Sequence, residues 1–204
     1  YSVERSNQIN NNNTNVDDFK SNFYNLNYNF LRLRKQDLLY QLNSSLNISL
    51  GYGKRSSLNN TKQRQIKIKG NWLFELNKKN AFFINLHMED LKSDGYLYNE
   101  LIRFGGITSI RGFEENSLFA KRMAVLCSEF RYRLSNDLFI HSVIDSGYFE
   151  DFFKTDHQIF GFGFGFGLQT NGGLMRLTYA NAKIKNNPFN ISNSKLHVSF
   201  TSNF

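Results

Sequence analysis

Apolar and polar residues alternate along most of the chain, and this alternation predicts β-strands. In the first clear segment, asparagines separate an apolar series of Tyr24, Leu26, Tyr28 and Phe30. Because successive side chains of a strand point to opposite faces, the segment has one apolar and one polar face. The pattern predicts nine strands, one from about residue 23 and the others near residues 40–52, 66–76, 82–89, 119–134, 138–149, 159–168, 173–180 and 195–204.

The lengths of these strands and of their connections favour a membrane barrel over a soluble two-sheet sandwich. Several strands approach or exceed the roughly 9 to 11 residues that cross a bilayer at a tilt. Connections at 34–37 and 77–80 are short, whereas those at 54–61 and 91–118 are long, as on the two sides of outer-membrane barrels. The polar faces are rich in Asn, Lys, Gln and Ser, which suit a water-filled lumen.

One predicted strand alternates phenylalanine with glycine from Phe160 to Gly167. A dinucleotide-binding loop needs G-x-G-x-x-G between a strand and a helix, whereas the glycine period here is two. We therefore predict a strand with one aromatic face and one bare face, where a bulky group approaches the backbone.

Composition and charge exclude several classes of protein. The 16% of aromatic residues exclude a disordered polymer, and no apolar stretch approaches the roughly 18 residues of a membrane-spanning helix. The single cysteine, Cys127, cannot form an internal disulfide. The net charge is +8, but we interpret the richest basic run as a solvated or lumen-facing strand side rather than a nucleic-acid patch. That run consists of Lys62, Arg64, Lys67 and Lys69, at strand spacing with Ile66 and Ile68.

The sequence contains no constellation for catalysis, and we predict no catalytic residue, metal or cofactor. The four histidines, at positions 87, 141, 157 and 197, lack metal-ligand spacing. No serine lies in a G-x-S-x-G turn. We therefore expect a protein that is not an enzyme.

The long connection carries the most specific pattern in the chain. Its residues 101 to 118 read LIRFGGITSIRGFEENSL, with Gly105 and Gly106 ahead of Ile110, Arg111, Gly112 and Phe113. This segment resembles the (V/I)-R-G-(F/Y) motif in the sixth extracellular loop of the BamA, TamA and FhaC superfamily of outer-membrane assembly and secretion barrels. Residues 128–131 and 143–147 resemble the S-x-E-x-R and F-x-D-x-G strands of the same superfamily, in the same order.

The resemblance implies that the loop is folded into the barrel lumen. Arg111 would be the cation at its tip, with Glu129 and Asp145 as its partners, since a guanidinium binds carboxylates bidentately. Gly112 would allow close backbone approach, and Phe113 would pack on the inner wall. The alternative is an exposed Arg111 and two ordinary lumen carboxylates.

The last strand resembles the carboxy-terminal signal of the superfamily and would form its seam. The residues concerned are His197, Val198, Phe200 and Phe204. Ser199 stands where the superfamily has Gly, and Ser202 where it has a hydrophobic residue.

We therefore expect an all-β fold, a transmembrane antiparallel β-barrel of which the chain holds the C-terminal nine or so of sixteen strands. The expected divisions are a polar loop or arm at 1–20, four strands within 21–92, the long extracellular loop at 93–118 and five strands within 119–204. A small complete barrel of eight or ten strands is the alternative.

We consider four functions in order of preference, of which the resemblance implies the first three. The first is assembly or insertion of outer-membrane proteins through a lateral seam, the second a two-partner secretion pore, and the third a barrel that anchors a patatin-like phospholipase. A soluble glycan-binding β-sandwich is the most remote. The expected location is the outer membrane of a Gram-negative-type cell. Expected partners are outer-membrane lipid, unfolded or secreted client proteins and accessory assembly lipoproteins, with no nucleic acid.

Overall fold

Ten strands form one antiparallel sheet, and two further strands form a small hairpin in the computed structural model, which describes residues 2–6, 19–33, 42–56 and 60–202. The strands of the sheet, in their order across it, are β1 (Ser2–Ser6), β2 (Phe19–Leu33), β3 (Leu42–Ser56), β4 (Thr61–Glu75), β5 (Asn80–Ser93), β8 (Arg122–Arg133), β9 (Leu138–Glu150), β10 (Asp156–Thr170), β11 (Gly173–Ile184) and β12 (Lys195–Ser202). The hairpin consists of β6 (Ile102–Phe104) and β7 (Leu118–Ala120).

Every strand of the sheet pairs with its neighbour in sequence, except where the segment between β5 and β8 leaves the sheet and returns to it. The strands from β2 to β5 and from β8 to β11 have 12 to 15 residues. Two 3-10 turns, η1 (Tyr98–Glu100) and η2 (Ile191–Asn193), lie in the longer connections. Among the described residues, no helix is long and apolar enough to cross a membrane.

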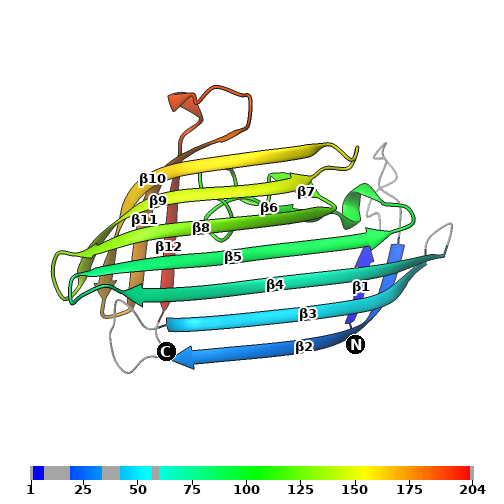
Figure 1. The fold of residues 1–204 in the computed structure, drawn as a ribbon, viewed down its shortest axis with the longest axis horizontal. Helices are drawn as coiled ribbons and strands as arrows, with labels where there is room; N and C mark the ends of the chain where they lie inside the picture. Colours follow the sequence, from blue (N-terminus) through cyan, green and yellow to red (C-terminus); the bar gives the residue numbers. More distant parts are fainter. Residues whose placement is uncertain (1, 7–18, 34–41, 57–59, 203–204) are drawn as a thin grey trace.

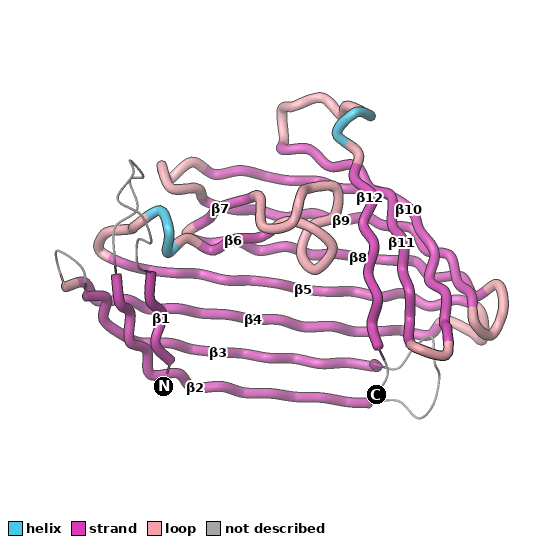
Figure 2. The backbone as a smooth tube through the Cα atoms, turned by 180° about the vertical axis from the view of Figure 1, so that it is seen from behind, coloured by secondary structure: helices cyan, strands magenta, loops and turns pink. Residues whose placement is uncertain are grey.

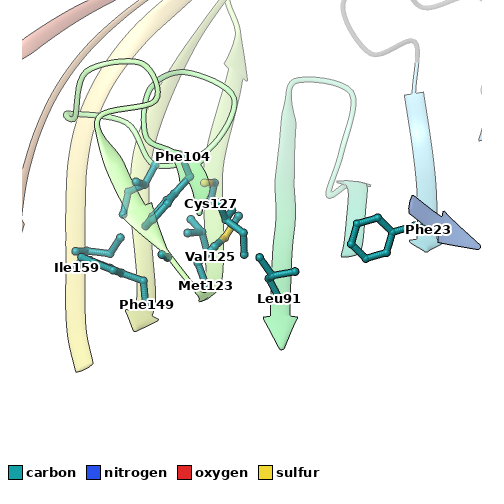
Figure 3. Close-up of a cluster of buried hydrophobic side chains, with 11 residues drawn as sticks. Phe23, Leu91, Phe104, Met123, Val125, Cys127, Phe149 and Ile159 are labelled. Carbon is teal, nitrogen blue, oxygen red and sulfur yellow. The ribbon is translucent and has the colours of Figure 1, made fainter. Parts of the chain in front are cut away.

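The sheet curls, and the connection between β5 and β8, here called loop 94–121, lies against its concave face (Figures 1 and 2). The main hydrophobic core forms between this loop and the strands beneath it. Figure 3 shows Phe104 of the loop gathered with Val125, Cys127, Phe149 and Ile159 from β8, β9 and β10. The core therefore anchors the loop, whereas a two-sheet sandwich would form its core between facing sheets.

The convex face of the sheet is apolar and exposed. Tyr24 and Leu26 on β2 are 73% and 71% exposed, and Ile144 on β9 and Phe164 on β10 are 67% and 66% exposed. The residues between them point to the concave face, where Asp145 and Val143 are each 1% exposed. An apolar face of this extent on a water-soluble monomer would be unusual, whereas it is the face that a membrane barrel turns to lipid.

The all-β, antiparallel prediction is confirmed, with ten strands in the sheet where we expected about nine. The additional strand is β1, which lies in the polar segment 1–20 that we expected to form a loop or arm. Its register runs from Ser2 opposite Phe23 to Ser6 opposite Phe19. Because β1 joins the sheet through the backbone of β2, it needs no apolar alternation of its own. Phe204 and the predicted turn at 34–37 lie outside the described residues.

Candidate functional site

Loop 94–121 brings the Ile-Arg-Gly-Phe segment against the inner wall of the sheet. The β6–β7 hairpin pairs Ile102 with Ala120 and closes the base of the loop. Beyond it, the Gly106 N–H donates to the Ile110 carbonyl at 3.0 Å and turns the chain back. Gly105 and Gly106 have φ angles of 110° and 93°, which side-chain-bearing residues rarely adopt. The tip of the loop is therefore a tight turn that presents Arg111.

Arg111 is buried and makes a bidentate ion pair with Asp145 of β9. Its Nε donates to Oδ2 at 2.8 Å, its Nη2 donates to Oδ1 at 2.5 Å, and its backbone N–H donates to Oδ2 at 3.0 Å. Its Nη1 donates to Oε1 of Glu129 on β8. Glu129 and Asp145 both point to the concave face because each lies one position from an outward residue of its strand. The structure thus brings together the three charged residues that the resemblance singled out.

Glu129 also binds two arginines from the barrel wall. Arg131 Nε and Arg176 Nη2 each donate to it at 2.7 Å. The cluster therefore holds three guanidinium groups and two carboxylates. Burial alone would lower the pKa of Arg111, but the hydrogen bonds and charge of Asp145, with the charge of Glu129, hold that pKa above its ordinary value. Arg111 consequently remains charged at any pH that the protein meets.

Gly112 allows the loop to touch the wall directly. Its φ is 90°, and a Cβ atom at this position would lie 2.6 Å from the backbone of Asn181 and Ala182 on β11. A Cβ atom at Gly161 would lie 2.7 Å from the carbonyl oxygen of Arg111. The group that approaches the bare face of β10 at Gly161 is therefore the loop itself.

The apolar residues of the segment join the core. Ile110 is fully buried, and Phe113 is partly buried and packs against the same cluster. Ser109 lies over β8, where its carbonyl oxygen accepts from the Sγ of Cys127. The loop therefore covers the only cysteine of the 204 residues.

The last strand contacts the loop through one of the residues that the sequence singled out. His197 points inward, and its Nε2 accepts from the backbone N–H of Gly112 at 3.0 Å. Val198 and Phe200 lie on the outer face and are 62% and 59% exposed. Phe204 lies outside the described residues.

A second anchor, which the sequence did not reveal, holds the start of the loop. Glu100 in η1 accepts from Arg55 Nη1 at 2.6 Å and from Gln63 Nε2 at 2.8 Å. Arg55 also donates to the carbonyl of Gly95 at 3.1 Å. The alternation of β3 and β4 places Arg55 and Gln63 on the inner face, but Glu100 follows no pattern that would assign it a partner. A third contact, between Lys195 and Glu114, is 2.7 Å long and exposed.

The described part of the chain contains no group of three His, Cys, Asp or Glu side chains arranged to hold a metal ion. The histidines instead have hydrogen-bonding partners within the protein. His87 Nε2 lies 2.8 Å from Glu89, and His141 Nε2 lies 3.1 Å from the Thr178 hydroxyl.

A curled antiparallel sheet with an apolar convex face, and with a loop held on its concave face by buried ion pairs, defines a β-barrel of the outer-membrane type. The chain belongs to the haemolysin secretion/activation family ShlB/FhaC/HecB, whose family model matches residues 2–169. This is a family of secretion proteins and not of enzymes. The family match does not support a specific similarity to BamA or TamA, the two proteins that the resemblance named first.

A solved structure with the same fold is CdiB from Acinetobacter baumannii, with a TM-score of 0.56 and 15% sequence identity. The alignment covers 81% of this chain and 30% of the CdiB chain, so this chain spans less than a third of the length of CdiB. No curated protein matches the sequence.

Proposed function

We propose that the chain belongs to an outer-membrane transporter that moves a secreted client protein through its barrel, as in two-partner secretion. The observation that carries this proposal is the buried ion-pair cluster that fixes loop 94–121 on the inner wall. Membership of a family of secretion proteins favours this function over outer-membrane protein assembly, which was our first hypothesis. The same membership gives no support to a phospholipase anchor or a glycan-binding sandwich.

The inner face away from the loop suits the passage of an extended polypeptide. Asn85 Nδ2 donates to Asn71 at 2.5 Å, and Asn71 Nδ2 donates to Ser45 at 3.1 Å. Such amide and hydroxyl groups exchange hydrogen bonds with water or with a passing backbone, and they offer little apolar surface on which a client would stick. The wall is therefore polar where a client would slide.

The loop, in contrast, lies against the concave face and would obstruct part of the lumen. A client must pass beside the loop or displace it. Displacing the Arg111 end would leave Asp145 without its guanidinium partner and remove one of the three arginines from Glu129, so we expect the cluster to hold during passage. The loop would then form a fixed part of the pore wall.

Secretion by cells that lack the endogenous transporter tests this function. The full-length protein would be supplied as wild type, as Arg111→Ala, or as Arg103→Ala, which removes an exposed arginine of the same loop. We expect wild type and Arg103→Ala to restore release of the client, and Arg111→Ala to reduce release while the barrel remains in the outer membrane.

Measuring the amounts of other outer-membrane proteins in the same cells separates secretion from assembly. The proposal predicts unchanged amounts in all three strains. If cells without the transporter lost other outer-membrane proteins but released the client normally, the result would contradict the secretion proposal and favour assembly.

A further inference from the structure

Five cations gather on the outward face of the sheet, near the ends of β2 to β5 that lie closest to η1. They are Lys20, Lys54, Lys62, Arg64 and Lys92, here called the outer basic patch. All five side chains are exposed, and none takes part in an ion pair within the described part of the chain. Figure 2 shows the corresponding strand ends side by side at one edge of the molecule.

The basic run that we predicted to form a single strand side is divided between the two faces of the sheet. Gln63 is 1% exposed and points to the concave face, so Lys62 and Arg64 on either side of it point outward. Lys67 points inward and lies 3.8 Å from Glu89. The outward members therefore belong to a different surface from the lumen lysines.

Four of the five cations of the patch face one another directly across the strands, whereas Lys20 lies opposite Ser56. Lys54 is the register partner of Lys62, and Arg64 is the register partner of Lys92. Like charges directly opposite each other destabilise a sheet. A bound anion would remove this repulsion, and the outward face has a hollow between Lys62, Arg64 and Lys92 in which an anion would fit.

The surroundings of the patch point to a lipid headgroup as the source of that anion. Tyr24 and Tyr52 pair in the same row as Arg64 and Lys92, directly beneath the Lys54–Lys62 pair, and Leu26 pairs with Leu50 in the next outward row. Tyrosines at this level are typical of the border between headgroups and hydrocarbon. At the opposite ends of β2 to β5, Arg32 is the one outward cation among the described strand residues, and the β4–β5 turn adds Lys78 and Lys79, so most of the outward strand cations lie at the ends near η1.

Carboxylates limit the patch on two sides. Arg122 on β8 lies 3.5 Å from Asp90 and 3.3 Å from Glu150, so its charge is compensated within the protein. Asp94 stands at the rim of the hollow. Within the described part of the chain, Arg122 therefore has ion-pair partners, whereas the five cations of the patch have none.

We infer that the outer basic patch binds the phosphate groups of a phosphorylated lipid in the outer leaflet. The inference rests on the membrane orientation that the proposed function implies. The planar guanidinium of Arg64 would bind a phosphate through bidentate hydrogen bonds, and the lysines would add point charges around it. Binding would also fix the height of β2 to β5 in the membrane.

Equilibrium binding to the full-length protein in detergent micelles tests the inference. The probes are lipid A with two phosphates, the same lipid without phosphates, and inorganic phosphate as a competitor. The variant Lys62→Gln/Arg64→Gln/Lys92→Gln removes three charges from the patch. The control Lys69→Gln/Lys78→Gln/Lys79→Gln removes three charges from the lumen and from the β4–β5 turn.

We expect the patch variant to bind the phosphorylated lipid about a hundredfold more weakly than wild type, taking roughly fivefold for each cation. The control should bind as wild type does, and the lipid without phosphates should bind weakly to every form. Equal binding by the patch and control variants would overturn the inference. Displacement of the lipid by millimolar inorganic phosphate would also overturn it, because the site would then be one for free phosphate.

Client release in cells, measured on the same variants, separates this inference from the proposed function. If lipid binding depends on the patch but the wild-type protein releases no client, the lipid site is supported and the secretion proposal fails. Normal release by a wild-type protein whose lipid binding does not depend on the patch would overturn the lipid site alone.

Discussion

Replacing Arg111 with alanine should release loop 94–121 from the wall, and the size of the effect follows from what each carboxylate loses. Glu129 keeps Arg131 and Arg176. Asp145 loses two side-chain hydrogen bonds and the only guanidinium bound to it in the described part of the chain. Removing one partner of a buried ion pair costs about 3–5 kcal/mol because the other charge remains buried. We expect the docked state of the loop to lose about this much stability.

Cys127 reports on docking directly, because it lies beneath Ser109 of the loop and is the only cysteine of the 204 residues. A thiol reagent added to outer-membrane vesicles should label it only when the loop opens. If the loop closes again faster than labelling occurs, the labelling rate follows the open population. A loss of about 3–5 kcal/mol should then accelerate labelling by roughly two to three and a half orders of magnitude, at 1.4 kcal/mol for each factor of ten.

Two further variants make this prediction specific. Arg103→Ala, on the same loop but outside the cluster, should label at the wild-type rate. Arg111→Ala/Asp145→Ala should label more slowly than Arg111→Ala, because it no longer contains the unpaired carboxylate. Wild-type labelling of Arg111→Ala would refute the reasoning, since it would mean that the core alone holds the loop.

Three smaller effects follow from the other contacts of the loop. Gly112→Ala should destabilise docking by about 1–3 kcal/mol through its positive φ and its contact with β11, and accelerated labelling of Cys127 would reveal it. Gly95→Ala should leave labelling unchanged, because a Cβ atom there would lie 4.0 Å from Arg55 Nη2, an ordinary van der Waals contact. Glu100→Ala should loosen the start of the loop by about 1.5–3 kcal/mol, seen as faster proteolysis between residues 94 and 101, and unchanged cleavage would count against the second anchor. Glu114→Gln breaks an exposed ion pair and should change neither readout measurably.

The alternation in the sequence predicted most of the sheet because a one-sided apolar strand leaves little freedom of register. β1 was missed for the opposite reason, since a short polar strand held by backbone hydrogen bonds has no pattern to detect. The basic run was misinterpreted as one face because Lys62 and Lys67 are an odd number of residues apart. In a strand, this spacing places them on opposite faces.

The site was partly accessible from sequence. The positions of Arg111, Glu129 and Asp145 followed from a resemblance in motif order, and alternation gave the direction of the two carboxylates. Nothing local marked Glu100, whose partners Arg55 and Gln63 lie 45 and 37 residues away. Contacts of this kind depend on how a long loop folds back over the sheet, which periodicity does not describe.

The central claim, passage of a client through the lumen beside a docked loop, is tested most directly by cross-linking a client in transit. A photoreactive residue would replace Asn71 on the inner face, Leu126 on the lipid face, or Val198 on the outer face of β12. The account predicts adducts with the client from position 71 and none from position 126 or 198. Adducts from position 198 alone would contradict it and indicate that the last strand, and not the lumen, handles the client.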